Sequence, residues 1–231
     1  MKIAIILISL GILGFYLMDI FFGIGFGVQH FSNGVKDLYL SNSKDILKVS
    51  NVVTSIVVNF RGFDTLGEVT VLFLASTALG GILYKKRHHV GERSVLFPAS
   101  RIVMSGAKLL FPSIVLLGAY VFIHGHLSPG GGFQGGTIIA TGFLLMLLTY
   151  RNYSVSHNRL VYFESLAGIL FISIGLVGYF SKGSFLENVL PVGNMNDLFS
   201  GGVIGIIYIA VGFKVAAELT GIIYTVLHEK D

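Results

Sequence analysis

Long apolar runs separated by short polar links dominate the pattern of this sequence. The runs cover about residues 3–28, 64–84, 102–124, 133–150, 160–180 and 199–227. Each reaches roughly 18 residues or more, which is long enough for a helix to cross a hydrocarbon core of about 30 Å. The first run is too long for the apolar part of a signal peptide and lacks an Ala-x-Ala-like exit. We therefore predict an all-α integral membrane protein with about six transmembrane helices.

The links divide this pattern into two parts. Residues 29–60 are mixed in character, and their stretch Val52–Val58 is too short to span, so we expect it at the membrane interface or against a partner. The basic sequence Lys85-Lys-Arg-His-His89 ends the second run and opens the link 85–101. We place the boundary there, between a two-helix part at 1–90 and a four-helix part at 91–231.

Lysine and arginine in the links predict the orientation, because cytoplasmic loops are enriched in these residues. With the 85–101 link and both termini in the cytoplasm, that side holds Lys2, Lys85, Lys86, Arg87, Arg93, Arg101, Arg151, Arg159 and Lys230. The outer side holds Lys36, Lys44, Lys48, Arg61 and Lys182. This excess predicts a multi-pass protein of the cell membrane with cytoplasmic N- and C-termini.

Composition agrees with a membrane protein and narrows the chemistry. The 231 residues are 53% hydrophobic and only 12% charged, whereas a soluble domain carries about a quarter charged residues. There is no Cys, so this sequence offers no thiolate ligand for zinc or an iron–sulfur cluster and no Cys nucleophile. The sequence shows no Walker motif, metal-ligand spacing or catalytic triad. We expect a chain that is not an enzyme by itself and that holds no cofactor or metal.

One glycine-dense polar island interrupts the apolar pattern. It reads His124-Gly-His-Leu-Ser-Pro-Gly-Gly-Gly-Phe-Gln-Gly-Gly136. A tight connection between two helices is the simple interpretation, but the island is richer than a turn requires. Its glycines and Pro129 make a poor helix interior and allow close approach of another backbone. We predict a docking surface for adjoining helices or subunits at Gly130, Gly131, Gly132, Phe133, Gly135 and Gly136.

Two carboxylates at the start of the second run are the first candidates for an ion pathway. Asp64 and Glu68 are four residues apart, so they share one face of a helix. In the structural interpretation, Asp64 caps the helix and Glu68 favours its positive end. In the functional one, Glu68 carries a proton or a sodium ion and Asp64 assists, because charges inside a bilayer are costly and therefore functional candidates.

Further polar groups interrupt the later runs. Lys108 lies one turn before Pro112, where it either snorkels to the surface or serves as a proton relay. His124 is a loop residue or a relay group that titrates near neutral pH. Lys214 and Glu218 lie one turn apart, either as an internal neutralising pair or as a link in an ion path. Glu164 and Asp19 are expected to be structural or to face other subunits.

Two stretches resemble one family of membrane complexes. Phe97-Pro-Ala-Ser-Arg-Ile102 and the island resemble the B subunit of Mrp-type multisubunit sodium/proton antiporters, over about residues 93–231. Val58-Asn-Phe-Arg-Gly-Phe-Asp-Thr-Leu-Gly-Glu68 resembles the C-terminal tail of the large A subunit, over about 1–90. By this resemblance Asp64 and Glu68 fall on the acidic motif of the tail. His124, Pro129 and Phe133 fall within the B-type signature.

The resemblance implies a subunit of a larger assembly. A tail freed from the large subunit is similar to the arrangement in archaeal membrane-bound hydrogenases and sulfane reductases. It implies a pathway for Na⁺ or H⁺ driven by a redox arm, with iron–sulfur or nickel–iron centres on partner subunits. Expected partners are C-, D-, E-, F- and G-like Mrp subunits and complex I-like or hydrogenase subunits. A subunit of a stand-alone Mrp antiporter and a scaffold between ion-carrying subunits remain as alternatives.

Overall fold

The computed structural model describes residues 2–23, 34–84, 99–150 and 153–228. In those ranges the chain is helical and contains no strand. The elements are α1 (Lys2–Gly23), α2 (Val35–Asp45), α3 (Val52–Thr54), the π-helix η1 (Ser55–Phe60), α4 (Gly62–Tyr84), α5 (Arg101–Ile123), α6 (Gly132–Thr149), α7 (His157–Lys182) and α8 (Val203–His228). Six of them, α1 and α4 to α8, are long and apolar enough to cross a membrane, which confirms the predicted fold class.

The chain separates into two compact units, Met1–Leu38 and Tyr39–Asp231. In the first unit, α1 is apolar on every side from Ile6 to Phe22 apart from Asp19, and the side chains of this stretch are exposed. A helix of this kind is typical of a membrane span. The predicted end of this helix, at 24–28, and the predicted boundary between 90 and 91 both lie outside the described residues.

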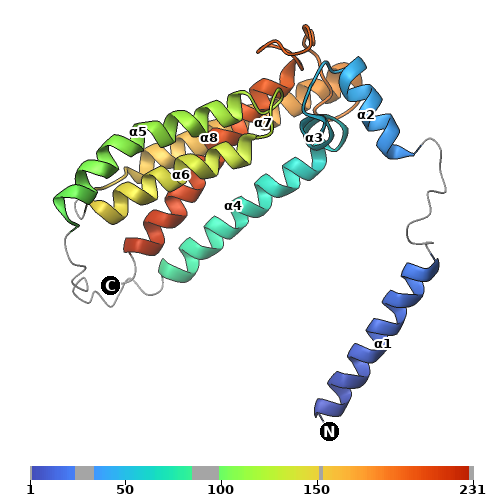
Figure 1. Cartoon of the computed structure of the whole chain (residues 1–231), viewed down its shortest axis with the longest axis horizontal. Helices are drawn as coiled ribbons and strands as arrows, with labels where there is room; N and C mark the ends of the chain where they lie inside the picture. Colours follow the sequence, from blue (N-terminus) through green and yellow to red (C-terminus); the bar gives the residue numbers. More distant parts are fainter. Residues whose placement is uncertain (1, 24–33, 85–98, 151–152, 229–231) are drawn as a thin grey trace. The chain divides into compact units, whose positions relative to one another are not determined.

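Helix α8 is the centre of the second unit. Helices α5, α6 and α7 lie lengthwise beside it in Figure 1, and α4 also packs against it. In its membrane-spanning part, 61% of the residues are buried, against 39% or less in the other five spans. Its residues Ile204, Ile207, Val211 and Val215 recur at helical spacing and form one buried stripe. This stripe is the hydrophobic core on which the surrounding helices pack.

Helix α6 is wedged between α5 and α8 because its first turns carry glycine. A Cβ atom at Gly135 would lie 2.6 Å from the carbonyl oxygen of Gly118 on α5, and one at Gly136 would lie 2.8 Å from that of Gly212 on α8. Only glycine permits such close approach of two helix backbones. The sequence predicts a helix from about residue 133, which contains Gly135 and Gly136, and α6 begins one residue earlier, at Gly132.

The region between α1 and α4 contains more helix than the pattern predicts. Helix α2 is polar and was not predicted as a separate element. The stretch Val52–Val58 forms α3 and most of η1, and it is too short to span, as expected. However, Thr54, Ser55 and Val58 are buried within the chain, against α4 and α8. The expectation that this stretch lies at the membrane interface or against a partner missed this packing within the chain.

Candidate functional site

A cluster of three charged side chains lies inside the helix bundle. The Lys214 Nζ is 3.2 Å from the Glu218 Oε2 and 3.5 Å from the Glu164 Oε1. Lys214 and Glu218 are one turn apart on α8, and Glu164 comes from α7, which packs alongside. The pair predicted from the α8 sequence is thus present. Its third member, Glu164, was expected to be structural or to face another subunit, and the structure places it in the cluster.

The cluster is enclosed mainly by apolar surface. Glu218 is 1% exposed and Lys214 6% exposed, near the middle of the 26-residue α8. The ring of Phe73 on α4 lies 5.4 Å from the Lys214 Nζ, so three helices surround this ammonium group. Apart from the ion pair, the Glu218 carboxylate oxygens have no hydrogen-bond partner among the residues that the structure describes. A buried charge set of this kind inside a membrane span is a candidate ion-transfer site.

The carboxylates Asp64 and Glu68 lie on the exposed surface of α4. Asp64 forms an ion pair with Arg61 at 2.5 Å, with both side chains at least half exposed. Glu68 is also exposed in this chain and is not brought into the buried cluster. The structure therefore leaves both roles that the sequence suggests for these residues open. The ion-pathway role of Glu68 and Asp64 stays a prediction.

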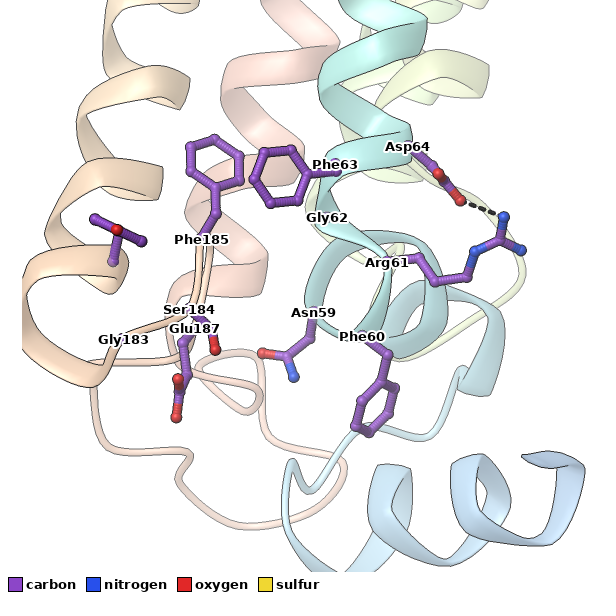
Figure 2. Close-up of a pocket in the computed structure, with 11 residues that line it drawn as sticks. Asn59, Phe60, Arg61, Gly62, Phe63, Asp64, Gly183, Ser184, Phe185 and Glu187 are labelled. Carbon is purple, nitrogen blue, oxygen red and sulfur yellow. Dashed lines mark ion pairs between the residues drawn. The ribbon is translucent and has the colours of Figure 1, made fainter. Parts of the chain in front are cut away.

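Asp64 also lines a pocket of about 670 Å³ at the end of the bundle where α4 begins. Figure 2 shows the residues from Asn59 to Asp64 on one side and the segment after α7 on the other. The Phe63 and Phe185 rings stack across it at 4.9 Å, and Glu187 points away from the Arg61–Asp64 pair. Over the described ranges, no group of three or more His, Cys, Asp or Glu side chains can hold a metal ion.

Lys108 and His124 are not buried in the way that Lys214 is. Lys108 is exposed on α5, and its Nζ lies 5.6 Å from the centre of the Tyr150 ring. His124 ends α5, stacks on Tyr120 at 4.2 Å and places its Nδ1 3.1 Å from the Tyr120 carbonyl oxygen. Neither joins the charged cluster. Their relay roles stay predictions.

The first half of the island, before α6, is docked onto the segment that precedes α4. The Asn51 side-chain amide donates to the carbonyl oxygens of Gly125 at 2.8 Å and Ser128 at 3.0 Å. The Thr54 hydroxyl also donates to the Gly125 carbonyl, at 2.7 Å, and accepts from the Tyr208 hydroxyl at 2.9 Å. These bonds join residues from both predicted parts of the chain. No pattern in the sequence indicates Asn51 or Tyr208.

Within this docked loop, the His126 side chain is buried, with 1% of its surface exposed. In the described part of the chain, neither ring nitrogen has a hydrogen-bond partner. Burial lowers the pKa of His126, and the nearby backbone carbonyls of Leu198 and Asp197 oppose this shift without forming well-aligned hydrogen bonds. The neutral form of the imidazole is therefore favoured in the folded chain.

The glycines predicted to pack against subunits make their contacts within this chain. Gly131, Gly132, Gly135 and Gly136 are buried, and a Cβ atom on any of them would meet atoms of this chain at 2.9 Å or less. Gly130 and Phe133 are partly buried. These contacts account for the glycines without a second subunit. Their predicted role in packing against other subunits stays a prediction.

These features define a multi-pass membrane protein with a buried cluster of charges between its helices. A family model described as a domain related to the MnhB subunit of Na⁺/H⁺ antiporter matches residues 102–221, and the MbhE model, which describes a subunit of MBH, matches residues 16–101. The chain belongs to the MnhB-related family. This finding confirms the resemblance to Mrp-type B subunits.

Two solved structures and one relative extend the comparison. The chain is 41% identical to a chain of the membrane-bound sulfane sulfur reductase (MBS), an archaeal respiratory membrane complex, with a TM-score of 0.82 over 98% of each chain. It is 25% identical to a chain of the Mrp complex from a Dietzia species, with a TM-score of 0.72, over 96% of this chain and 25% of that one. It is 30% identical to an uncharacterized protein of Methanocaldococcus jannaschii, over 86% of this chain and 84% of that protein.

Proposed function

We propose that this chain is a membrane subunit of a multisubunit ion-translocating assembly and that Glu164, Lys214 and Glu218 lie on its ion path. The observation that carries the proposal is the buried cluster near the middle of α8, in a bundle whose other buried side chains are largely apolar. Removing such charges from water costs several kcal/mol for each ion. A packing role alone is served as well by apolar residues of similar volume.

Coupling to a redox arm is the first form of this proposal. The match to the sulfane sulfur reductase chain covers 98% of both chains, so this chain corresponds to a whole subunit of that respiratory complex. The chain has no Cys, so iron–sulfur or nickel–iron centres would belong to partner subunits, and the chain would be non-catalytic. The N- and C-termini would lie in the cytoplasm, following the excess of Lys and Arg on that side.

A subunit of a stand-alone antiporter is the second form. It is favoured by the match to the Mrp complex, where this chain aligns with a quarter of one longer chain. In that complex, the region that matches both parts of the present chain is a segment of one longer polypeptide. Both forms use the same membrane bundle, and they differ in the partners they require.

Identifying the native partners separates the two forms. The chain is purified in a gentle detergent from its native membrane, and the proteins that copurify are identified by mass spectrometry. Cysteine-rich iron–sulfur or nickel-site subunits would support the redox-driven complex, whereas Mrp-like membrane subunits with a large antiporter chain would support the exchanger. Recovery of this chain alone would contradict an assembly.

Transport by the intact complex then tests the pathway. Glu218→Gln removes the buried carboxylate charge with little change of shape, so we expect loss of ion transport in membrane vesicles while the complex stays assembled. Glu187→Gln is the matched control, since Glu187 lies in the loop after α7 and outside the charged cluster. Full transport with assembled Glu218→Gln complex would favour a scaffold between ion-carrying subunits.

A further inference from the structure

The two carboxylates of the cluster differ in their access to the surface of the chain. The Glu218 side chain is fully buried, whereas 18% of the Glu164 side chain is exposed. The Lys214 ammonium contacts both carboxylates. Of these two carboxylates, Glu164 is therefore the one that a group from the surface of this chain can reach.

The charge count leaves the cluster one positive charge short. Two carboxylates and one ammonium carry a net charge of −1 when all three are ionised. Of the charged residues on the helices packed against α8, only Glu164 pairs with Lys214 in the described part of the chain. On α4, Asp64 pairs with Arg61, and Glu68 is exposed. On α5, Lys108 contacts Tyr150 and Arg101 is exposed, while α6 carries no charge. On α7, Arg159 and Lys182 are exposed near the helix ends. Within a low-dielectric interior, one added proton or one monovalent cation neutralises the cluster.

The surroundings favour a proton over a sodium ion. Hard metal cations in proteins are enclosed by several oxygen ligands, and the charged oxygens here come from two carboxylates only. The Lys214 ammonium already contacts both carboxylates and repels a second cation. On the α4 side the neighbour is the ring of Phe73, which supplies no oxygen. A proton needs no ligand shell and binds directly to a carboxylate oxygen.

We propose that the Glu164–Lys214–Glu218 cluster takes up a single proton at Glu164, its surface group, and passes it through Lys214 to Glu218, its interior group. The inference rests on the proposed function, because it names the ion that this part of the assembly carries. Glu68 is not part of this transfer, because it lies on the exposed surface of α4 and outside the cluster.

The transfer is balanced without any redox partner. A proton from the surface binds the Glu164 carboxylate and forms an O–H bond. Lys214 gives a proton to the Glu218 Oε2, breaking an N–H bond and forming an O–H bond, and its neutral amine then takes the proton from Glu164. Glu164 is again a carboxylate, Lys214 is again an ammonium, and Glu218 holds the proton. The distances of 3.2 and 3.5 Å require only small movements of the flexible lysine chain.

Infrared difference spectroscopy of the purified complex in lipid tests this proposal directly. Protonation of Glu218 produces a carbonyl stretch of a buried carboxylic acid, which we expect to titrate with pH. The band should be absent in Glu218→Gln and retained in the control Glu187→Gln. In Glu164→Gln the interior group remains, so we expect the band with slower proton uptake after a pH jump.

Sodium provides the decisive comparison. Titrations are repeated at two concentrations of NaCl, with choline chloride holding the ionic strength constant. An unchanged titration supports a proton site. A titration that moves to lower pH as sodium rises, by about one pH unit for each tenfold increase, would show competition for one site and overturn the proposal.

The failure of this inference differs from the failure of the proposed function. Sodium competition at Glu218 would leave the cluster on an ion path and change only the ion. A wild-type complex without any titrating carboxyl band, together with full transport in Glu218→Gln, would remove the cluster from the path altogether. If Glu218→Gln does not assemble, Glu218→Asp keeps the acid and shortens its reach, and we expect a retained band with slower transfer.

Discussion

Tyr208 on α8 donates a hydrogen bond to the Thr54 hydroxyl at 2.9 Å, across 154 positions of the sequence. Thr54 in turn donates to the Gly125 carbonyl oxygen in the loop after α5. Tyr208 and Thr54 are both buried, so the chain of two bonds is shielded from solvent. It fastens the segment before α4 to the bundle formed by α5, α6 and α8.

Removing this hydrogen bond should weaken the attachment. We expect Tyr208→Phe to lower the free energy of unfolding by about 1 kcal/mol, because one buried bond is lost while Thr54 keeps its bond to Gly125. Thr54→Val should cost more, since it leaves the Tyr208 hydroxyl buried without a partner. Thermal unfolding of the purified protein measures both. Thr77→Val on the exposed face of α4 is the control, and an equal loss there would contradict the role of this bond.

The two members of the charged cluster on α8 could be predicted from the sequence, whereas the third could not. Lys214 and Glu218 are four residues apart, so any helix brings them together. Glu164 reaches Lys214 only through the register between α7 and α8, which is set by packing along their whole length. The sequence contains no local signal for that register. A carboxylate at matching membrane depth on a neighbouring helix is the signal that would have identified Glu164.

The glycines of the island show a different limit. Their low helix propensity correctly indicates a special backbone, but Gly132, Gly135 and Gly136 all lie in α6, which begins one residue before the predicted start at 133. In the bundle, close approach to Gly118 and Gly212 outweighs that propensity. Local preference describes single residues, whereas helix contact depends on two segments at once.

The contact between α5 and α6 gives a prediction with a matched control. Gly135→Ala places a Cβ atom 2.6 Å from the Gly118 carbonyl oxygen, so the backbones must separate, at a cost of about 1–3 kcal/mol. Gly106→Ala on α5 meets no atom within 4 Å and should be neutral or slightly stabilising. Thermal unfolding of the two variants compares them directly. Equal stability would show that α5 and α6 are not held at this contact.

Removing the Lys214 charge alone should destabilise the chain more than removing the charges of Lys214 and Glu218 together. Lys214→Met leaves two buried or partly buried carboxylates without their counter-ion, for which we expect a loss of about 3–5 kcal/mol. Adding Glu218→Gln should recover a large part of that loss, because the most buried negative charge is then removed. Assembly yield and thermal unfolding of the single and double variants measure the recovery. Additive losses would contradict coupling between these two residues.

Burial of His126 predicts a pH dependence of stability. Its pKa in the folded chain lies below the value of 6.5 that applies when it is solvent-exposed, so the unfolded chain binds the proton more readily. The stability is fully present above pH 6.5 and falls as the pH decreases from there towards the folded pKa. Thermal unfolding across this range should show a steeper acid loss in the wild type than in His126→Asn. Parallel curves would contradict a buried neutral imidazole.

The predicted ion-pathway role of Glu68, on the exposed surface of α4, can be tested separately. Its carboxylate is exposed on the surface of this chain within a membrane-spanning helix, where facing lipid costs about 2–3 kcal/mol or more. We therefore expect a partner subunit or a water-filled path to cover it. Glu68→Gln should reduce ion transport by the assembled complex, while Thr70→Val, also on the exposed surface of α4, should not. Transport measured in vesicles, normalised to the amount of assembled complex, compares them. Full transport by Glu68→Gln would remove Glu68 from the ion path.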